Sequence, residues 1–393
     1  MDIIYSVWTV LQIIIGFNLI LPLFLFIAKS ILAKEAPRPL PESEYDYAII
    51  VTAYEQTTLL PSVVDSILKL DYKNYLVYIV ADNCDISTLN FNSSAVIVLR
   101  PEEVLASNTK SHFYAIKNFK REHDFLTIID SDNLVEPQYL NELNRFFNAG
   151  YIAVQGVRAA KNLNTSYACL DEAGDMYYRF IDRKLLYEVG SSASLAGSGM
   201  AFTTAYYREC LEFLNIKGAG FDKALQMEIL NRGKRIAFAE NAIVYDEKTS
   251  KSGQLVNQRA RWINTWFKYA GQGVKLIGSG LYNLNWNQFL CGIVFSRPPL
   301  FIIVGLTFLS MVLDLFVAPV MLLFWLFAIV SFFLIFFTAL RHFRATKAIY
   351  RALVNIPRFI FLQVLSLMKV RSANKISTAT VHYHDSTIDQ VDK

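Results

Sequence analysis

Two long apolar runs constrain this chain more than any other feature of its sequence. Residues 3–28 contain no charged side chain, and the run is longer than the roughly 20 residues that an α-helix needs to cross a bilayer. A second run, 298–340, has Asp314 as its only charge and is long enough for two helices with a turn near Asp314 and Pro319. The first run is not preceded by the basic region of a signal peptide, and it has no small-residue cleavage site. We therefore expect an uncleaved anchor at 1–30 and two transmembrane helices at 298–340.

The distribution of Lys and Arg predicts how these segments are oriented. Basic residues follow both apolar runs, at 29–38 and at 341–351, whereas only Asp2 precedes the first. Cytoplasmic loops carry such an excess of positive charge. The N-terminus should thus be external and the region between the runs cytoplasmic. We expect a protein integral to the inner or plasma membrane.

Two shorter apolar stretches and a polar tail complete the membrane-related part of the chain. Residues 350–370 are interrupted by Arg358 and flanked by basic residues, which favours an interfacial helix over a fourth span. Residues 276–296 have the same character more weakly and are expected to form another interfacial helix. The polar tail, 374–393, should be disordered or act as a gating segment. Its two histidines, His382 and His384, could bind a metal but are more simply solvated.

Composition excludes several functional classes. Charged residues make up 18% of the chain, below the 25% or so of soluble proteins. The net charge of +4 gives no reason to expect nucleic acid as a partner. The four cysteines are far apart and form no Cys-x-x-Cys pair, so neither a zinc site nor a disulfide framework is expected.

The central region alternates buried-strand patterns with helical ones. Strands are predicted at 47–54, 75–85, 95–100 and 125–133, and helices at 59–70 and 111–122. This alternation indicates an α/β domain, 40–275, with a mostly parallel sheet. Three of the strands end in acids, at Glu55, Asp82 and Asp130. Ligands bind beyond the carboxyl ends of strands in such sheets, so these acids are candidates for a binding site.

The segment "DSD" at 130–132 is the strongest single candidate. If the strand continued through it, Asp130 and Asp132 would share one face and offer oxygen ligands to Mg²⁺ or Mn²⁺. A turn that merely ends the strand is the alternative, because Asp favours turns. "GSGM" at 197–200 lacks the third glycine of a dinucleotide cradle. A loop that approaches its ligand closely explains it better.

Other polar motifs leave more than one interpretation open. "QRARW" at 258–262 lies beside apolar sequence, where Arg and Trp are typical of an interfacial belt. A site in which Arg meets a phosphate and Trp meets a sugar is the alternative. Asp171, Glu172 and Asp175 have helical spacing, and a solvated helix face is their simplest explanation.

Taken in order, these motifs resemble those of a known enzyme family. The segments are "VTAYEQ", "VADNCD", "DSDN", "AGSGMAF", "FDKALQMEILNRG" and "QRARW". The chain resembles the membrane-bound, processive members of glycosyltransferase family 2, which are the cellulose, chitin, hyaluronan and poly-N-acetylglucosamine synthases. It departs from their pattern at Thr52, where the family has Pro, and at Phe221, where the family has Glu.

The resemblance implies a GT-A domain that uses a nucleotide sugar, most simply a UDP-sugar. It assigns Tyr54, Glu55, Asp82 and Lys110 to the nucleotide, and Asp130 and Asp132 to a Mg²⁺ or Mn²⁺ ion. Arg261 would face the donor diphosphate, which suits a planar cation that binds phosphate through two N–H groups. Asp130 would then belong to both the donor and the metal site.

The same resemblance assigns the acceptor side and the general base. Gly197, Ser198 and Gly199 would line the acceptor site, Gln258 would hydrogen-bond there, and Trp262 would stack on a sugar ring. Asp222 would remove the proton from the attacking hydroxyl during transfer with inversion. Its alternative role is an N-cap of the helix that follows.

Two other functions compete with polysaccharide synthesis. A non-processive enzyme that glycosylates a lipid, as ceramide glucosyltransferases do, would need few membrane helices. A transporter or structural membrane protein is disfavoured because Asp314 is the only ionisable residue within the spans. Expected partners are a nucleotide-sugar donor, a glycan or lipid-linked acceptor and membrane lipids, and a homo-oligomer or export partner is left open.

Overall fold

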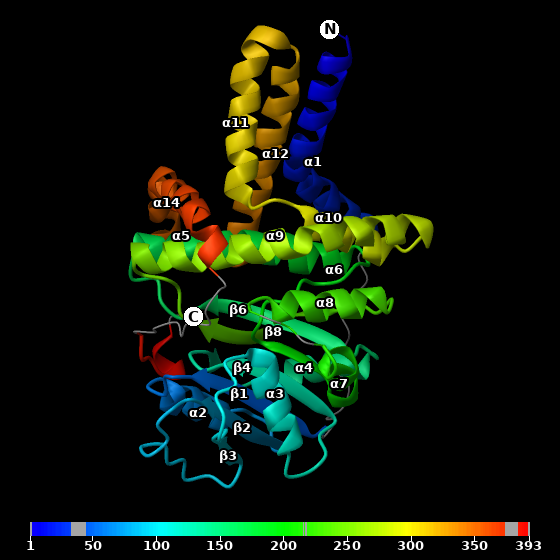
Figure 1. Cartoon of the computed structure of the whole chain (residues 1–393). Coiled ribbons are helices and arrows are strands. Elements are labelled where there is room, and N and C mark those ends of the chain that lie inside the picture. Colours follow the sequence, from blue (N-terminus) through cyan, green and yellow to red (C-terminus); the bar gives the residue numbers. More distant parts are fainter. Residues whose placement is uncertain (1, 33–44, 215, 217, 374–383, 392–393) are drawn as a thin grey trace. The chain divides into compact units, whose positions relative to one another are not determined.

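The structure is a computed structural model that describes residues 2–32, 45–214, 216, 218–373 and 384–391. The chain divides into two compact units (Figure 1). The helical unit comprises Met1–Lys34, Cys169–Ser191 and Lys251–Arg371. The sheet unit comprises Glu35–Ala168, Ser192–Ser250 and Ser372–Lys393. All four cysteines lie within the described residues and are free and buried.

The sheet unit is built on one eight-stranded sheet, in the order β3-β2-β1-β4-β7-β6-β8-β5. Its strands are β1 (Tyr47–Tyr54), β2 (Tyr75–Asp82), β3 (Val96–Leu99), β4 (Phe125–Asp130), β5 (Leu134–Val135), β6 (Ala153–Ala160), β7 (Met200–Thr203) and β8 (Ala237–Asp246). The helices are α2 (Leu60–Leu68), α3 (Asn108–Lys117), α4 (Tyr139–Asn148), α7 (Thr204–Leu211) and α8 (Phe221–Asn231), with the 3₁₀ turn η4 (Ile388–Gln390).

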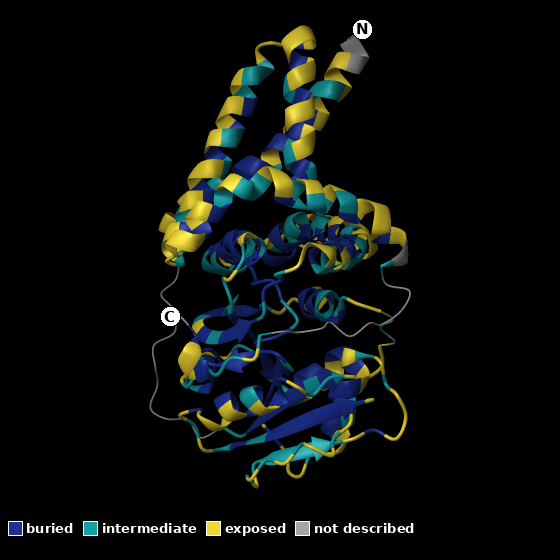
Figure 2. Ribbon diagram, turned by 90° about the vertical axis from the view of Figure 1, so that its left-hand side faces the viewer, coloured by how far each residue is buried: buried dark blue, intermediate teal, exposed yellow. Residues whose placement is uncertain are grey.

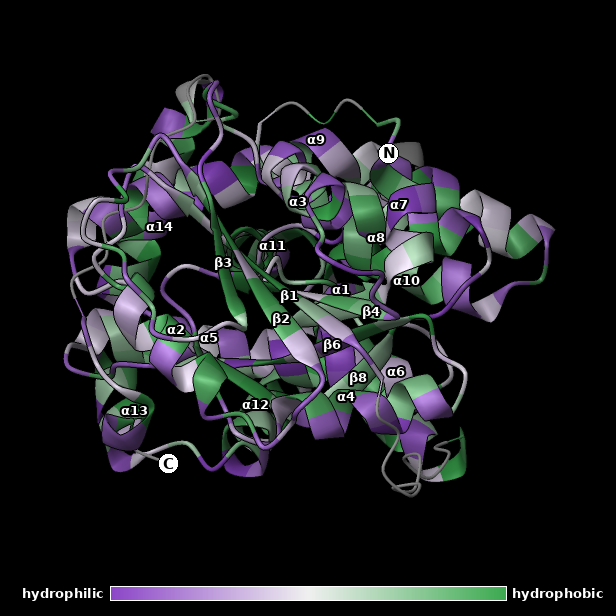
Figure 3. Ribbon diagram, turned by 90° about the horizontal axis from the view of Figure 1, so that it is seen from below, coloured by the Kyte–Doolittle hydropathy of each residue, from purple (hydrophilic) through white to green (hydrophobic). Residues whose placement is uncertain are grey.

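The predicted strands all form, and they make up one parallel part of the sheet, while β6 and β8 form another parallel pair. β3, β2, β1 and β4 pair in parallel, with Tyr47 in register with both Tyr75 and Phe125. β1 and β2 are hydrophobic and almost wholly buried (Figure 3), which is why their apolar runs were recognisable. β7, however, runs antiparallel to both of its neighbours, β4 and β6. The sheet is therefore mixed, and the prediction of a mostly parallel sheet holds for one half only.

The helical unit contains every helix expected from the apolar runs. Its elements are α1 (Asp2–Leu32), α5 (Ser166–Tyr178), the π-helix η1 (Arg179–Leu185), α6 (Leu186–Glu188), α9 (Ser252–Tyr282), α10 (Trp286–Ser296), α11 (Leu300–Val317), α12 (Met321–His342), α13 (Lys347–Ala352), η2 (Leu353–Asn355), α14 (Ile356–Lys369) and η3 (Val370–Ser372). Figure 2 shows its long helices largely exposed and the strands of the sheet buried. α11 ends at Val317 and α12 begins at Met321. Pro319 therefore lies in the turn as predicted, whereas Asp314 lies inside α11.

Four described segments are long and apolar enough to cross a membrane. They are Tyr5–Leu32, Leu300–Val317, Met321–His342 and Lys347–Lys369. The first three match the predicted spans. The fourth meets the same criteria of length and composition, so the choice between an interfacial helix and a span at 350–370 stays a prediction.

The predicted boundary between residues 275 and 276 falls inside a helix. α9 continues to Tyr282, and α10 follows after a short turn. The two helices pack closely because glycines face each other: a Cβ on Gly292 would lie 2.8 Å from the carbonyl oxygen of Gly273. The region from 276 to 296 is thus the end of one helix plus a second helix, rather than a separate interfacial helix.

The acidic residues of α5 are buried in ion pairs, contrary to the predicted solvated face. Asp171 pairs with Arg259 of α9, and Glu172 lies 3.0 Å from Arg179 of η1. Both carboxylates are at most 3% exposed. Helical spacing alone could not distinguish this arrangement from a solvated face, because both basic partners lie on other elements.

Asp314 joins the three candidate spans α1, α11 and α12. Its carboxylate is fully buried and accepts hydrogen bonds from Trp8 Nε1, Gln12 Nε2 and Trp325 Nε1, each at 3.0 Å. Within this unit, α1 contacts both members of the α11–α12 hairpin (Figure 1). A buried carboxylate with three N–H donors is well satisfied, so Asp314 fixes the contact between α1 and the hairpin.

We predict that replacing Asp314→Leu destabilises the helical unit. The substitution leaves the buried N–H groups of Trp8, Gln12 and Trp325 without this acceptor, at about 1–3 kcal/mol for each group that finds no other partner. Thermal unfolding in detergent should show a clear drop in the melting temperature, with Asp314→Asn in between. Phe316→Leu, at an exposed position of α11, serves as the control. Equal melting of Asp314→Leu and the wild type would contradict this role.

Candidate active site

Three neighbouring strands bring the predicted donor residues to one edge of the sheet. β2, β1 and β4 are adjacent and parallel, with Tyr54 in register with Asp82 and Thr52 in register with Asp130. Glu55 follows β1 directly, its N–H donates to the carbonyl of Asp82, and its carboxylate accepts a hydrogen bond from Asn83 Nδ2. A hydrogen bond with the Glu55 carboxylate also raises the pKa of Tyr54. Tyr54, Glu55 and Asp82 therefore form one group, as expected.

Asp82 holds the loop that precedes α3. Its side chain is 2% exposed and accepts hydrogen bonds from the N–H groups of Leu105, at 2.9 Å, and Ala106, at 2.7 Å. α3 then begins after its N-cap Ser107, with Lys110 exposed in the first turn. The carboxylate predicted to bind the nucleotide thus positions the loop that leads into the helix of Lys110.

Strained backbone gathers at this edge. Glu55, Asn83 and Ala106 have φ values of 60°, 51° and 43°, which non-glycine residues rarely adopt. They follow β1, follow β2 and precede α3, respectively. Such conformations persist where the surrounding structure enforces them, and they cluster at functional sites.

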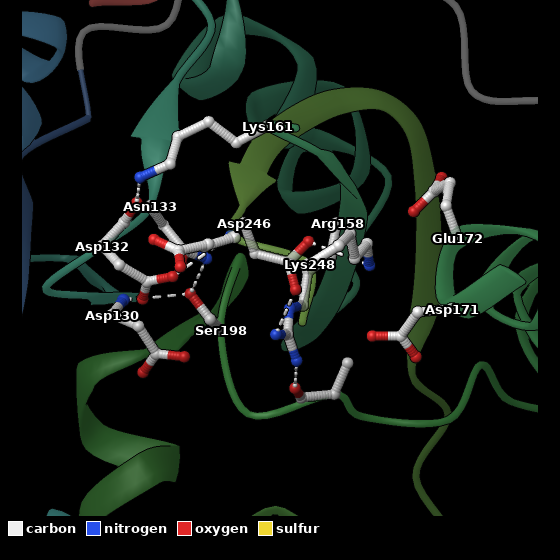
Figure 4. Close-up of polar contacts among 12 residues, drawn as sticks. Asp130, Asp132, Asn133, Arg158, Lys161, Asp171, Glu172, Ser198, Asp246 and Lys248 are labelled. Carbon is white, nitrogen blue, oxygen red and sulfur yellow. Dashed lines mark hydrogen bonds and ion pairs between the residues drawn. The ribbon is translucent and has the colours of Figure 1, made fainter. Parts of the chain in front are cut away.

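The DSDN turn is held by the glycine-rich segment through one hydroxyl (Figure 4). β4 ends at Asp130, so strand alternation does not extend to Asp132, which lies in the turn that follows. Ser198 Oγ accepts hydrogen bonds from Asp130 N, at 3.0 Å, and Asn133 Nδ2, at 2.9 Å. Ser198 is fully buried. Its side chain therefore positions the turn, and its assignment to the acceptor site stays a prediction.

Glycine is required on both sides of Ser198. Gly197 and Gly199 have φ values of 87° and 62°, and a Cβ on Gly199 would lie 2.8 Å from Val244 Cγ2. The fully buried Gln155 of β6 completes the arrangement. Its amide accepts from Ala196 N and donates to the carbonyls of Ser198 and Gly199. Nothing in the sequence around Gln155 indicated this role, because polar Gln155 and Arg158 interrupt β6 and leave no regular apolar pattern.

Asp132 is fixed from two later loops. Its carbonyl accepts a hydrogen bond from Lys161 Nζ at 2.9 Å, and its carboxylate accepts from Glu247 N at 3.2 Å (Figure 4). The carboxylate of the nearby Asp246 forms ion pairs with Arg158, at 2.6 Å, and with Lys248, at 3.1 Å. Among the residues that the structure describes, no group of three or more His, Cys, Asp or Glu could hold a metal ion. Asp130 and Asp132 would thus supply two ligands at most, which suits an ion that takes the others from phosphates and water.

Asp222 lies in the first turn of α8, but it does not cap that helix. The N-cap is Gly220, with a φ of 95°, and no side chain caps the helix. α8 is tied to the segment before the glycine-rich loop, because Gln226 Oε1 accepts from Leu195 N at 3.0 Å. The N-cap alternative for Asp222 is therefore wrong. Hydrogen bonds connect the helix that carries Asp222 with the loop that holds the DSDN turn.

The "QRARW" residues lie on α9 in the helical unit. Arg259, the arginine to which no role was assigned, pairs with Asp171 and lies 4.2 Å from the centroid of the Trp262 ring. Trp262 is 44% exposed although one arginine already covers it. Burial lowers the pKa of Arg261. Gln258, Arg261 and Trp262 thus belong to the helical unit, and the other predicted site residues to the sheet unit.

Comparison with known proteins identifies the family. The model of "Glycosyltransferase like family 2" matches residues 44–265, more than half of the 393 residues. The chain belongs to this family. The match extends from the start of the sheet unit through the "QRARW" segment, and it makes the protein a glycosyltransferase. No curated protein sequence matches the chain.

A solved structure of low sequence identity, a mannosyltransferase, shares the fold of this chain. The mannosyltransferase PcManGT from Pyrobaculum calidifontis, in complex with GDP-Man and Mn²⁺, is 15% identical with a TM-score of 0.53. The match covers 83% of this glycosyltransferase and 98% of the other chain. S. aureus TarS 1-349 in complex with UDP-GlcNAc is 14% identical, covering 84% and 90% of the two chains, with a TM-score of 0.44. The mixed α/β fold is accordingly GT-A-like.

His112 of α3 supports the start of α8 and makes the sheet unit sensitive to acid. Its ring lies 5.1 Å from that of Phe221 between centroids, and its Nδ1 lies 2.7 Å from the Tyr207 hydroxyl. Burial lowers the pKa of His112 to about 3, whereas an unfolded histidine has a pKa of about 6.5. The unfolded chain therefore binds a proton that the folded chain rejects between these two values.

We predict that the glycosyltransferase loses stability as the pH falls below about 6.5, by up to about 1.4 kcal/mol per pH unit from His112. His112→Gln removes this titration and keeps a polar partner for Tyr207. Melting temperatures at pH 7 and pH 5 should therefore differ less for His112→Gln than for the wild type. If the melting temperature falls equally in the wild type and in His112→Gln between pH 7 and pH 5, His112 is not the cause of the acid sensitivity.

Proposed function

We propose that this enzyme transfers a sugar from a nucleotide sugar, most simply a UDP-sugar, to a growing polysaccharide with inversion at the anomeric carbon. The observation that carries the proposal is the continuous hydrogen-bonded network of the sheet unit. It joins the DSDN turn, the glycine-rich loop and the helix of Asp222 at the carboxyl ends of the strands. Such an edge is where α/β sheets bind ligands.

In this proposal the donor lies beyond β2, β1 and β4. Tyr54, Glu55 and Asp82 contact the base or ribose, and the exposed Lys110 reaches the phosphates. The Asp82 carboxylate accepts hydrogen bonds from the backbone N–H groups of Leu105 and Ala106. It would therefore also position the loop beside the proposed nucleotide site. Arg261 neutralises the leaving diphosphate, for which a permanently charged, planar guanidinium is suited.

Asp130 and Asp132 would hold Mg²⁺ or Mn²⁺ on the diphosphate. The ion would supply charge neutralisation as the nucleotide departs. The protein's contribution is a turn that cannot move freely, since Ser198, Lys161 and Glu247 all hold it. The mannosyltransferase with the same fold was solved in complex with Mn²⁺, which supports a divalent ion here.

Asp222 would accept the proton of the acceptor hydroxyl while that oxygen attacks the anomeric carbon. The C–O bond to the diphosphate breaks as the new glycosidic bond forms, and the nucleotide diphosphate leaves. The acceptor would be held by the backbone at Gly197 and Gly199 and by Gln258. Trp262, 44% exposed, would present its uncovered surface to a sugar ring.

A lipid acceptor is the second candidate for the same site. The described residues contain four segments able to span a membrane, which is few for a channel that exports a polymer. Membrane lipids surround such helices, so a lipid-linked acceptor could reach the enzyme without a channel. Export of a polymer would instead need a homo-oligomer or a partner protein.

We predict transfer from one nucleotide sugar when membranes containing the full chain are given a panel of radiolabelled UDP-glucose, UDP-GlcNAc and GDP-mannose. Sizing the product separates polymer from single addition to a lipid. EDTA should abolish the transfer, and Mn²⁺ or Mg²⁺ should restore it, because without the ion the negative carboxylates of Asp130 and Asp132 would repel the diphosphate that they are proposed to hold through it. Incorporation that continues in EDTA would refute the metal assignment, and the absence of any transfer would refute the donor class.

We predict that Asp222→Asn lowers the rate by about 10²–10⁴-fold, the usual loss when a general base is removed. Asn keeps the shape of the side chain but cannot accept the proton. Folding should be unaffected because Asp222 makes no cap. Glu228→Gln on the same helix is the matched control, since Glu228 pairs with Arg232. If Asp222→Asn binds nucleotide and turns over at a near-normal rate, Asp222 is not the general base.

We propose that the enzyme is integral to the cell membrane with its sheet unit in the cytoplasm. The basic residues after both apolar runs support this orientation. Thiols introduced at Tyr45 and Gln390 should be protected from an impermeant reagent in intact cells. The four native cysteines are buried and should contribute little background. Labelling of either introduced thiol in intact cells would contradict the proposed orientation.

A further inference from the structure

The chain that follows the candidate span α12 is basic throughout. Residues 341–371 contain seven Lys and Arg side chains and no Asp or Glu. Four of these cations, which we name the basic patch, lie close together in sequence at the end of α12, in the turn after it and in α13: Arg341, Arg344, Lys347 and Arg351. All four are exposed. Among the described residues, no acidic side chain pairs with any of them.

This basic segment ends where the helical unit ends, at Arg371. Residues 374–383, which include the candidate metal ligand His382, lie outside the described residues. Residues 384–391 belong to the sheet unit, and their Ile388 and Val391 are 3% and 7% exposed. The disorder expected for the tail is therefore wrong for 384–391, and these residues are not part of the basic patch.

Cations at the ends of the other candidate spans are paired within the protein. Lys29, in the last turn of α1, lies 3.6 Å from Glu188, which also pairs with Lys184. Arg297, just before α11, pairs with Asp182 at 2.6 Å. The helical unit thus neutralises these cations itself, whereas it supplies no described counter-charge for the basic patch at the end of α12.

Arg344 keeps a backbone conformation that glycine normally adopts. Its φ is 53°, and it lies in the turn that ends α12, where the N–H of Ala345 donates to the carbonyl of Leu340 at 2.8 Å. Helices commonly end with Gly at such a position, because a side chain makes a positive φ unfavourable. A strained residue that is also an unpaired cation points to a function for its side chain.

α14, the helix after the basic patch, is too short to cross a bilayer. Its 14 residues extend for about 21 Å, less than the roughly 30 Å of a hydrocarbon core. The 3₁₀ turn η2 separates it from α13. α14 also packs on α9 (Figure 1), with Lys369 donating to Asn257 Oδ1 at 3.1 Å and Asn264 donating to the carbonyl of Val370 at 2.9 Å.

The face of α14 away from its buried side chains is apolar and exposed. Phe359 and Ser366 are buried. Phe361 and Met368 each follow one of them by two residues, which is about 200° round the helix, and they are 60% and 83% exposed. An apolar helix face beside several Lys and Arg is typical of a helix that lies on a membrane surface and attracts anionic lipids.

We propose that the basic patch and the exposed face of α14 form a binding surface for anionic phospholipids of the surrounding bilayer. The inference rests on α12 crossing a bilayer, which places Arg341 at the level of the headgroups, and it does not depend on sugar transfer. Headgroup phosphates supply the counter-charge that the patch lacks, and acyl chains cover Phe361 and Met368. Four or more Lys and Arg next to a transmembrane helix are typical of sites for acidic lipids.

The test measures which phospholipid gathers at the patch. The full chain carries one introduced thiol with a fluorophore, either Thr346→Cys inside the patch or Val320→Cys in the turn between α11 and α12. It is placed in nanodiscs of phosphatidylcholine and phosphatidylglycerol, without a lipid-linked acceptor, in which one of the two lipids carries a nitroxide quencher near its headgroup. The Thr346 side chain makes no cap hydrogen bond and Val320 is 79% exposed, so neither change should disturb the fold.

Phosphatidylglycerol should quench the fluorophore at position 346 more strongly than phosphatidylcholine does at the same mole fraction, whereas the two lipids should quench equally at position 320. The preference at 346 should fall by up to about fivefold for each cation of the patch that is replaced by Gln. Lys in place of Arg341, Arg344 and Arg351 keeps the charge and is the matched control, which should keep the preference. Added salt should weaken it.

Several outcomes would overturn the inference. They are equal quenching by both lipids at 346 in the wild type, a preference that survives replacement of all four cations by Gln, and the absence of quenching at both positions, which would show that α12 does not cross the bilayer. If the fourfold variant melts early in phosphatidylcholine alone, the single variants Arg344→Gln and Lys347→Gln decide by the same ratio. Sugar transfer is not measured here, so failure of the proposed transferase activity would leave these results unchanged.

Discussion

The site depends on one buried hydroxyl, that of Ser198. It accepts hydrogen bonds from N–H groups at both ends of the DSDN turn. The hydroxyl reaches these donors because Gly197 and Gly199, on either side of Ser198, adopt φ values that favour glycine. The same segment is held by Gln155 from β6 and, through Leu195, by α8. Strands β4 and β6 and helix α8 therefore all bond to the segment around this buried residue. The arrangement resists motion because leaving a buried N–H without a partner is costly.

The parallel half of the sheet could be predicted because its strands are buried on both faces. β1 and β2 are continuous apolar runs, and their acidic ends marked the edge where Tyr54, Glu55, Asp82 and Asp130 gather. The other half gave no such signal. β7 has only four residues, and β6 carries Gln155, Gly156 and Arg158 inside its run with an irregular register beside them. These residues serve the glycine-rich loop, so the strand that builds the site is the one whose pattern is least regular.

Charged residues were harder to interpret than apolar ones, because their partners are distant in sequence. Asp171 and Glu172 looked like a solvated face, yet both are buried against arginines. Asp314 looked like a turn residue, yet it accepts three hydrogen bonds inside the helical unit. In the "QRARW" segment the resemblance drew attention to Arg261, while the structure gives Arg259 the ion pair and the contact with Trp262. A sequence shows that a charge is present in an apolar context, but not what satisfies it.

Asp222 shows how a structure can narrow the role of a residue before any experiment. A carboxylate at the start of a helix is usually explained by capping, which is sufficient reason for an Asp there. In α8 that explanation does not apply, because Gly220 occupies the N-cap and the helix is secured through Gln226 instead. A carboxylate that the fold does not use for capping, on a helix tied by hydrogen bonds to the segment that holds the DSDN turn, suits the proposed role of general base.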